Sequence, residues 1–113
     1  MTHSSEAIVK TQAETYNAHN LEGFAATFAP DVELYQLPAM APFMTGREAL
    51  RQFYAENRFN LPTLRADVTN QMIFGNFVIY DENISGLAED GVVRMIAIYH
   101  VESGLIRRVW FIR

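Results

Sequence analysis

The chain has 113 residues, a formal net charge of −4 and no cysteine, and half of its residues are apolar. This length predicts a single domain over residues 1–113 with a packed core. The acidic balance argues against a nucleic-acid partner, because nucleic-acid binders carry a basic patch. No apolar run approaches the ~18 residues of a membrane span, so we expect no membrane association. The lack of cysteine excludes a thiolate nucleophile and is compatible with a reducing cytoplasm, where we expect the protein to reside.

Three helices are predicted in the first part of the chain. Side chains recur at helical spacing from about residue 5 to about residue 19. Asn20 has the side chain of an N-cap for a second, short helix, LEGFAATFA, which we expect Pro30 to end. The third helix is predicted over REALRQFYAENRF, residues 47–59.

Strand patterns fill the remainder. Residues 31–37, DVELYQL, alternate between polar and apolar and predict a strand between the second and third helices. Beyond Pro62 come four β-rich runs: TLRADVTNQMIF, FVIYDENIS, VVRMIAIYHV and LIRRVWFIR. Their short joints contain glycine, as in Glu89-Asp90-Gly91, and short joints force neighbouring strands to be antiparallel. Helices followed by such a four-stranded meander predict an α+β domain.

The last two strands are apolar on both faces. In VVRMIAIYHV, Ile96 and Ile98 lie on one face, and Met95 and Tyr99 lie on the other. An antiparallel sheet with one wet face should instead alternate with polar residues. Because three helices can cover only one face, we predict a homodimer packed through the outer sheet face. The alternative is that a loop or the first helix covers part of that face.

The order of these elements resembles the cone-shaped fold of nuclear transport factor 2-like proteins, also called cystatin-like. The segment YNAHNLEGFAATFAPDVELYQLP resembles ketosteroid isomerase-like and SnoaL-like proteins, TGREALRQFYAENRF is similar to their third helix, and YHVESGLIRRVWFIR resembles their final hairpin. The resemblance implies three N-terminal helices packed on a curved, mostly antiparallel sheet. It also implies a deep apolar pocket for a small organic ligand of polyketide or steroid type.

The resemblance argues against steroid isomerase activity itself. Ketosteroid isomerases place a catalytic Asp at the end of the first strand, a Tyr on the first helix and a protonated Asp on a meander strand. These positions fall on Gln36, Gln12 and Ile96 of this chain. An amide does not abstract a carbon-bound proton, and isoleucine does not donate a hydrogen bond. Tyr54 does match a pocket-lining tyrosine of the third helix.

Two pairs of side chains on the first strand and the helices are candidates for ligand contacts, and each has a structural alternative. Gln12 and Gln36 could hold a ligand carbonyl or hydroxyl, or could bond to each other or to backbone, because an unpaired buried amide costs about 1–3 kcal/mol. Tyr16 and Tyr54 could donate to a ligand oxygen, or could simply pack in the core.

The meander supplies further candidates. Asp81 and Glu82 occupy a mostly apolar run, so that either carboxylate could face the pocket as an acid or base, or both could reach water. Arg94 is expected to pair with one of them across the strands. His100 shares its face with Ile96, which the family register directs into the pocket, although His100 could also be a plain strand-end residue. The expected ligand-binding set is Gln12, Tyr16, Gln36, Tyr54, Asp81, Ile96 and His100.

The sequence assigns no catalytic base. Its three histidines are scattered and it contains no phosphate-binding glycine loop, so we expect neither a metal nor a cofactor. Two functions from different classes stay open. One is a cofactor-free isomerase, cyclase or hydratase-like enzyme acting on a small hydrophobic molecule. The other is a non-catalytic ligand-binding or dimerisation module.

Overall fold

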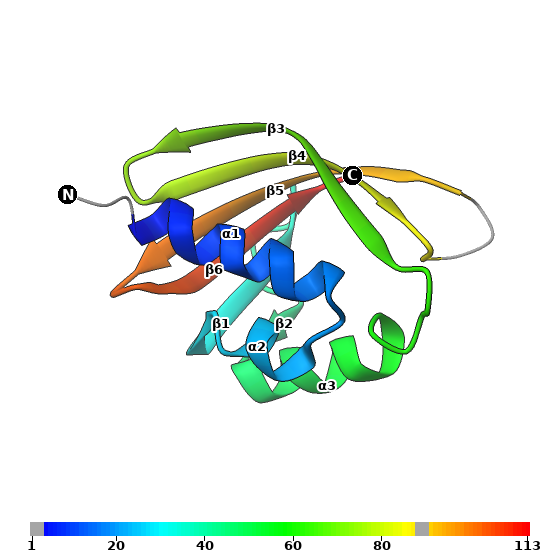
Figure 1. Cartoon of the computed structure of the whole chain (residues 1–113). Helices are drawn as coiled ribbons and strands as arrows, with labels where there is room; N and C mark the ends of the chain where they lie inside the picture. Colours follow the sequence, from blue (N-terminus) through cyan, green and yellow to red (C-terminus); the bar gives the residue numbers. More distant parts are fainter. Residues whose placement is uncertain (1–3, 88–90) are drawn as a thin grey trace.

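The computed structural model describes residues 4–87 and 91–113. Its elements in chain order are α1 (Ser4–Asn17), α2 (Leu21–Ala25), β1 (Phe28–Gln36), β2 (Met44–Thr45), α3 (Arg47–Asn57), β3 (Arg65–Phe74), β4 (Phe77–Ser85), β5 (Val93–Glu102) and β6 (Leu105–Ile112). The strands form one sheet in the order β2-β1-β6-β5-β4-β3. Figure 1 shows this curved sheet arching over the three helices, which lie on its concave side. Among the described residues, no helix is long and apolar enough to cross a bilayer.

The predicted α+β fold and its meander are confirmed. Strands β3 to β6 pair antiparallel with their chain neighbours, whereas β1 joins the sheet by a parallel pairing with β6. Gly75 and Gly104 take positive φ angles of 60° and 80° at two of the predicted turns, a conformation that glycine adopts without steric cost. The third predicted turn, Glu89-Asp90-Gly91, includes residues 88–90, which lie outside the described residues.

The boundary between α2 and β1 differs from the prediction. The helix ends at Ala25, and the strand already begins at Phe28, so that Pro30 lies inside β1 and does not end the helix. Proline has no N–H for a sheet ladder and is tolerated where one side of the strand is unpaired. Strand β2 pairs with β1 only at Glu33 and Leu34, which leaves Pro30 on such an edge.

The core lies between the helices and the concave face. Phe24 of α2 packs its ring 4.8 Å from that of Tyr54 and 5.0 Å from that of Phe28, measured between centroids. Each helix contributes a side chain that is almost completely buried, namely Val9, Phe24 and Leu50. They meet the inward residues of the sheet, including Val32, Val78, Ala97 and Ile106. Burial of a side chain of this size contributes about 1.5–3 kcal/mol.

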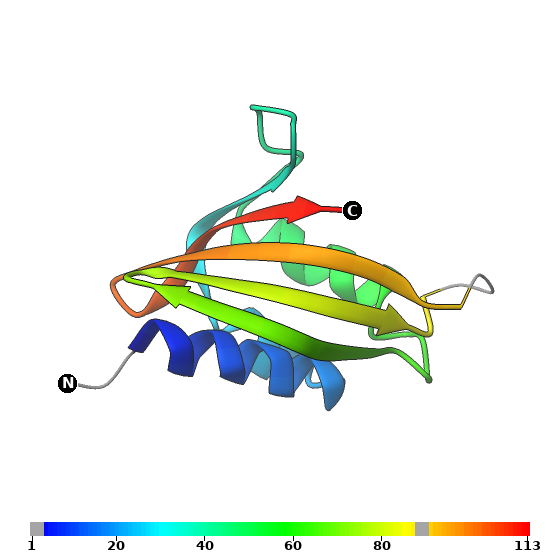
Figure 2. The same cartoon turned by 90° about the horizontal axis from the view of Figure 1, so that it is seen from above.

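The outer face of the sheet carries an aromatic strip. Tyr35 stacks on Trp110 with ring centroids 5.6 Å apart, and Phe77 stacks on His100 at 4.8 Å. Phe74, beside Phe77, is 77% exposed. Figure 2 shows the sheet with its helices from a second direction. The three helices lie on the concave side, so no helix covers this strip (Figure 1). Phe77 is 37% exposed and the other three rings are half-buried, which leaves an apolar surface of the kind that marks an interaction site.

We propose that a second copy of the chain covers the aromatic strip (Tyr35, Phe77, His100 and Trp110). Charges on the same face are already paired within one chain, as in Arg94 with Asp81 at 2.7 Å and Arg108 with Glu33 at 3.1 Å. The face therefore presents apolar rings without an excess of either charge. Such a surface can meet its own copy across a two-fold axis, where each patch faces itself.

Trp110→Ala is expected to weaken this dimer more than it weakens the fold, because truncating an aromatic anchor at an interface costs more than 2 kcal/mol when it is a hot spot, about a thirtyfold loss of affinity. Sedimentation velocity measures the dimer, and thermal unfolding measures the fold. Met40→Ala is the control, because Met40 is an exposed apolar side chain (89%) on the β1–β2 connection and is not part of the strip. A wild-type protein that sediments as a monomer at micromolar concentration would remove the proposal.

Candidate functional site

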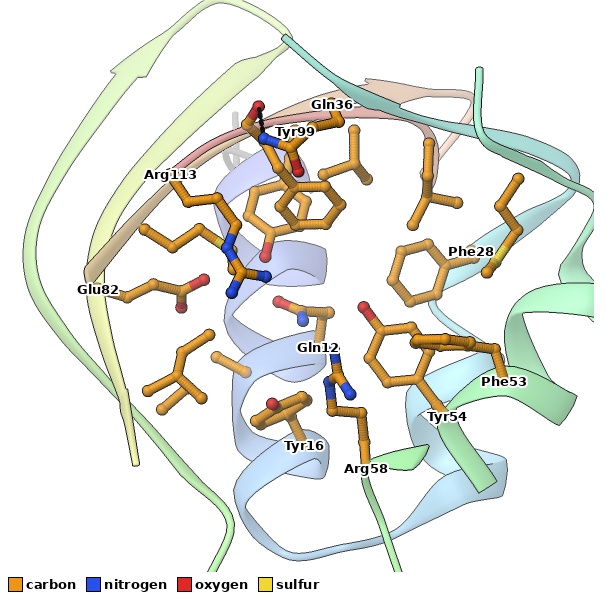
Figure 3. A pocket seen from close by; sticks show the side chains of 18 of the residues that line it. Gln12, Tyr16, Phe28, Gln36, Phe53, Tyr54, Arg58, Glu82, Tyr99 and Arg113 are labelled. Carbon is orange, nitrogen blue, oxygen red and sulfur yellow. Dashed lines mark hydrogen bonds between the residues drawn. The ribbon is translucent and has the colours of Figure 1, made fainter. Parts of the chain in front are cut away.

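A cavity of about 250 Å³ lies between the concave face and the helices. Its wall is built by α1, α3 and the inward side chains of the strands (Figure 3). Most of this wall is apolar, with Phe28, Leu34, Met44, Met95, Val109 and Phe111. An apolar cavity with a few convergent polar groups is the usual form of a small-molecule site.

Polar groups reach this cavity from separate elements. Helix α1 supplies Gln12 and Tyr16, and α3 supplies Tyr54. Glu82 of β4 and Tyr99 of β5 reach it from the sheet, and in Figure 3 these side chains point toward a common centre. Residues 4–87 and 91–113 contain no group of three His, Asp or Glu side chains placed to share a metal ion.

Glu82 is the only carboxylate among the described residues that line the cavity. It lies on the inward face of β4 with Val78, Tyr80 and Ile84, and it is only 6% exposed. Burial removes water from the carboxylate and raises the pKa of Glu82 from 4.5 to about 7. A carboxyl group with this pKa exists in both protonation states near neutral pH, as a general acid–base catalyst requires.

The tyrosines around Glu82 remain neutral. Burial raises the pKa of Tyr54 to about 12, although the positive charge of Arg58 acts in the opposite direction. The pKa values of Tyr16 and Tyr99 are raised as well, first by burial, and the charge of Glu82 adds to the shift in both. Protonated phenols donate hydrogen bonds, so these hydroxyls are suited to hold a ligand oxygen.

The two glutamines differ in the hydrogen-bond partners of their side-chain amides. Gln12 is 7% exposed, and its Oε1 has no hydrogen-bond partner among the described residues. Gln36 donates from Nε2 to the carbonyl oxygen of Phe111 over a long 3.4 Å. That carbonyl also accepts from the backbone N–H of Leu37 at 2.9 Å, so it does not depend on the amide. Gln12 in particular carries a buried polar atom that a ligand could satisfy.

Two arginines also line the cavity. Arg58, just after α3, donates from one guanidinium nitrogen to the carbonyl oxygen of Asn57 at 2.8 Å. Its guanidinium carbon lies 5.1 Å from the centre of the Phe53 ring, which holds it by a cation–π contact. Arg113 reaches the cavity from the end of β6 and is exposed. Sequence reasoning placed neither Arg58 nor Glu82 in the expected ligand-binding set.

Four residues of the expected set line the cavity, namely Gln12, Tyr16, Gln36 and Tyr54. The other three, Asp81, Ile96 and His100, do not. Asp81 faces outward and pairs with Arg94, as expected for that pair, and His100 stacks on Phe77 in the aromatic strip. Ile96 lies opposite Asp81 in the sheet register and therefore on the same outer face.

The wrong placement of Asp81, Ile96 and His100 in the cavity has one physical cause. Side chains alternate along a strand, so a shift of one residue in the assumed register moves every side chain to the other face. Ala97 and Tyr99 pack inward, at 0% and 3% exposure, which turns Ile96 and His100 outward. On β4 the same alternation selects Glu82 and not Asp81. The inward series Val78, Tyr80, Glu82, Ile84 was visible in the sequence and was the signal for the buried carboxylate.

The comparisons with known proteins agree with this architecture. The family model of the SnoaL-like domain matches residues 9–109, and the chain therefore belongs to this family. No curated protein matches the chain at a significant level.

Solved structures extend the relationship to the whole fold. A proposed ketosteroid isomerase from Kribbella flavida superimposes with a TM-score of 0.83 at 25% identity, over 98% of this chain and 78% of that one. An uncharacterized cystatin-fold protein from Novosphingobium aromaticivorans gives 0.86 at 23% identity, over 100% of both chains. A proposed polyketide cyclase from Sinorhizobium meliloti gives 0.79 at 17% identity, over 97% and 99%. The expected nuclear transport factor 2-like, cystatin-like fold is confirmed.

Gln36→Leu is expected to change the free energy of unfolding by less than about 1 kcal/mol, because the Phe111 carbonyl keeps its bond from Leu37. Chemical denaturation measures this change. The matched variant Gln12→Leu removes a buried amide whose oxygen is unpaired, and it should be neutral or stabilising. A loss of several kcal/mol in either variant would show that the amide supports the fold.

Glu82→Gln is expected to stabilise the protein in a pH-dependent way. The folded state holds the Glu82 proton up to a pKa of about 7, whereas the unfolded chain releases it near 4.5. Between these values the folded state binds more protons, so that stability falls as pH rises. Above about pH 7 the loss amounts to about 3 kcal/mol, and the glutamine variant avoids it.

Urea denaturation over this pH range measures the effect. The two proteins should agree below about pH 4.5 and diverge above it, with the variant more stable. Asp81→Asn is the control, because Asp81 is the next residue on β4 and its pKa is lowered by its hydrogen bond to Arg94, the opposite direction. Parallel pH curves for wild type and Glu82→Gln would contradict the burial of an ionisable Glu82.

Proposed function

We propose that the cavity binds a small apolar carbonyl compound and that Glu82 transfers a proton on it without a cofactor. One observation carries the proposal: a carboxyl group with a pKa of about 7 lies in an apolar cavity, with neutral tyrosine hydroxyls on the facing elements. A desolvated carboxyl that titrates near neutrality, inside a cleft, is characteristic of acid–base sites. In this proposal the base is Glu82 on β4, whereas the position that carries the base in ketosteroid isomerases is Gln36 on β1 and cannot serve as one.

The chemistry is proton abstraction next to a carbonyl group. The Glu82 carboxylate takes a proton from the carbon beside the carbonyl, and the electron pair of that C–H bond moves onto the carbonyl oxygen. Hydrogen bonds from Tyr54 or Tyr99, together with the positive charge of Arg58, stabilise the resulting enolate. These donors are already positioned before the reaction begins, so they need little rearrangement as charge develops.

Two reactions can follow from the enolate, and each returns the proton that Glu82 took. In an isomerisation, the protonated Glu82 returns its proton to a different carbon of the conjugated system. In a cyclisation, the enolate carbon adds to a second carbonyl of the same molecule, and Glu82 gives its proton to that carbonyl's oxygen. Either path regenerates the carboxylate and needs no oxidant or reductant. They are the activity classes for which two of the structural neighbours are named.

The size of the cavity bears on the substrate. At about 250 Å³ it falls just below the usual range for ligand pockets, which is ~300–1,000 Å³. This favours a molecule of one or two rings over a four-ring steroid. Gln12 and Gln36 also stand where steroid isomerases have their Tyr and Asp, which argues against steroid isomerase activity. Ile96 faces outward and therefore no longer contributes to the argument against that activity.

The test is exchange of carbon-bound hydrogen in D2O, followed by NMR. The reference substrate is 2-acetylnaphthalene, a two-ring ketone, within a panel of one- and two-ring ketones. Wild type should accelerate exchange beside the carbonyl, with a rate that rises with pH and levels off above about 7 as Glu82 ionises. Glu82→Gln should lose about 10²–10⁴-fold of the acceleration, and Asp81→Asn should retain it.

Exchange that is equally fast in wild type and Glu82→Gln would refute Glu82 as the base. Binding of the ketones without any acceleration would leave the second function, a non-catalytic ligand-binding module. A robust turnover of a 3-keto-Δ5-steroid would contradict the argument from cavity size and from Gln12 and Gln36.

A further inference from the structure

The arginines of this chain fall into three groups. Five of those described are in ion-pair contact with a carboxylate, and none of these five lines the cavity: Arg51, Arg65, Arg94, Arg107 and Arg108. Arg58 and Arg113 both line the cavity, and neither has a carboxylate partner among residues 4–87 and 91–113. The remaining described arginine, Arg47, also has no carboxylate partner among these residues, but it donates to the carbonyl oxygen of Phe28 at 3.2 Å and does not line the cavity. Both guanidinium groups that line the cavity therefore lack a counter-charge among the described residues.

Arg58 is positioned for an anion. Its bond to the Asn57 carbonyl and its contact with the Phe53 ring fix the guanidinium, yet they use only one of its five N–H donors. The remaining donors form the planar fork that matches a carboxylate. Figure 3 shows the Arg58 guanidinium pointing into the cavity between Gln12 and Tyr54.

The balance of charge in the cavity favours the same ligand. Two guanidinium groups face one carboxyl, Glu82, which burial keeps largely protonated below neutrality, so the lining is net positive. The aromatic wall alone would also suit an ammonium group, which binds over ring faces. The positive charges of the two arginines would repel such a cation.

We propose that the ligand is an apolar carboxylic acid of one or two rings, with its carboxylate on Arg58 and Arg113 and its body against the apolar wall. This inference rests on the proposed function in one respect: the carbon beside a second, carbonyl group of this acid is the one that Glu82 deprotonates. It assigns Arg58 and Arg113 as specificity-determining residues, because they select an anionic substrate over its neutral analogue.

The test compares two probes of nearly equal shape by calorimetry. One is 2-naphthoate, and the other is 2-acetylnaphthalene, in which a methyl group replaces a carboxylate oxygen. At about pH 6 and low ionic strength, wild type should bind the acid at least about tenfold more tightly than the ketone. Added salt should reduce this preference, because it screens the charges.

Variants locate the preference. Arg58→Met keeps the apolar stem, removes the charge and should abolish most of the tenfold preference, whereas Arg58→Lys should keep part of it. Arg113→Met should reduce it less, because Arg113 is exposed. Lys10→Met is the control, because it removes one exposed positive charge that does not line the cavity. An unchanged midpoint of thermal unfolding shows that Arg58→Met keeps the wild-type fold.

Equal affinity for the acid and the ketone in wild type would overturn the inference, as would a preference that survives in Arg58→Met and Arg113→Met together. Tightest binding of the naphthyl trimethylammonium analogue would overturn it in favour of a cation. These results are separable from the proposed function. Glu82-dependent exchange without acid preference leaves the function standing, and acid preference without exchange leaves only the binding site.

Discussion

The parallel pairing of β1 with β6 is the contact on which the rest of the molecule depends. It joins the first strand to the last, far apart in the chain, with Leu34 opposite Val109 and Gln36 opposite Phe111. Backbone hydrogen bonds of 2.9 Å extend the junction at both ends, from Ile106 to Thr27 and from Leu37 to Phe111. The helices reach the concave face because they are attached to β1 on either side. Without this pairing, β1 and the helices attached to it would not be held against the meander, and the cavity would open to water.

The closed cavity is what changes the chemistry of Glu82. A carboxylate at the same position in water would titrate near its ordinary value and would be a weak base. Inside the cavity the loss of hydration raises its pKa to about 7, and the same burial keeps the tyrosines protonated. The ionised carboxylate destabilises the fold, and the packed residues around Val9, Phe24 and Leu50 offset that cost. Such a local cost to stability is common at functional sites.

The distribution of charge follows the same division between inside and outside. On the outer face, Arg94 and Asp81 neutralise each other beside the aromatic strip, as do Arg108 and Glu33. In the cavity, Arg58 is held by a carbonyl oxygen and a ring and keeps its charge unpaired among the described residues. The outer face is therefore suited to contact with a like surface, whereas the cavity is suited to a ligand with an anionic group.

Local sequence patterns determined much of this protein. Helical spacing, the Asn20 cap, the glycine turns and the period-two runs predicted the helices and the meander, because each depends on residues close together in the chain. Gln12, Tyr16, Gln36 and Tyr54 were also placed in the cavity from sequence and resemblance. Tertiary structure alone decided which face of each strand is inside. Alternation is symmetric between the two faces, so Asp81 and Glu82, or Ile96 and Met95, exchange roles on a shift of one residue. Only the long-range packing of the helices on Ala97 and Tyr99 removes that symmetry, and with it selects Glu82 as the buried carboxylate.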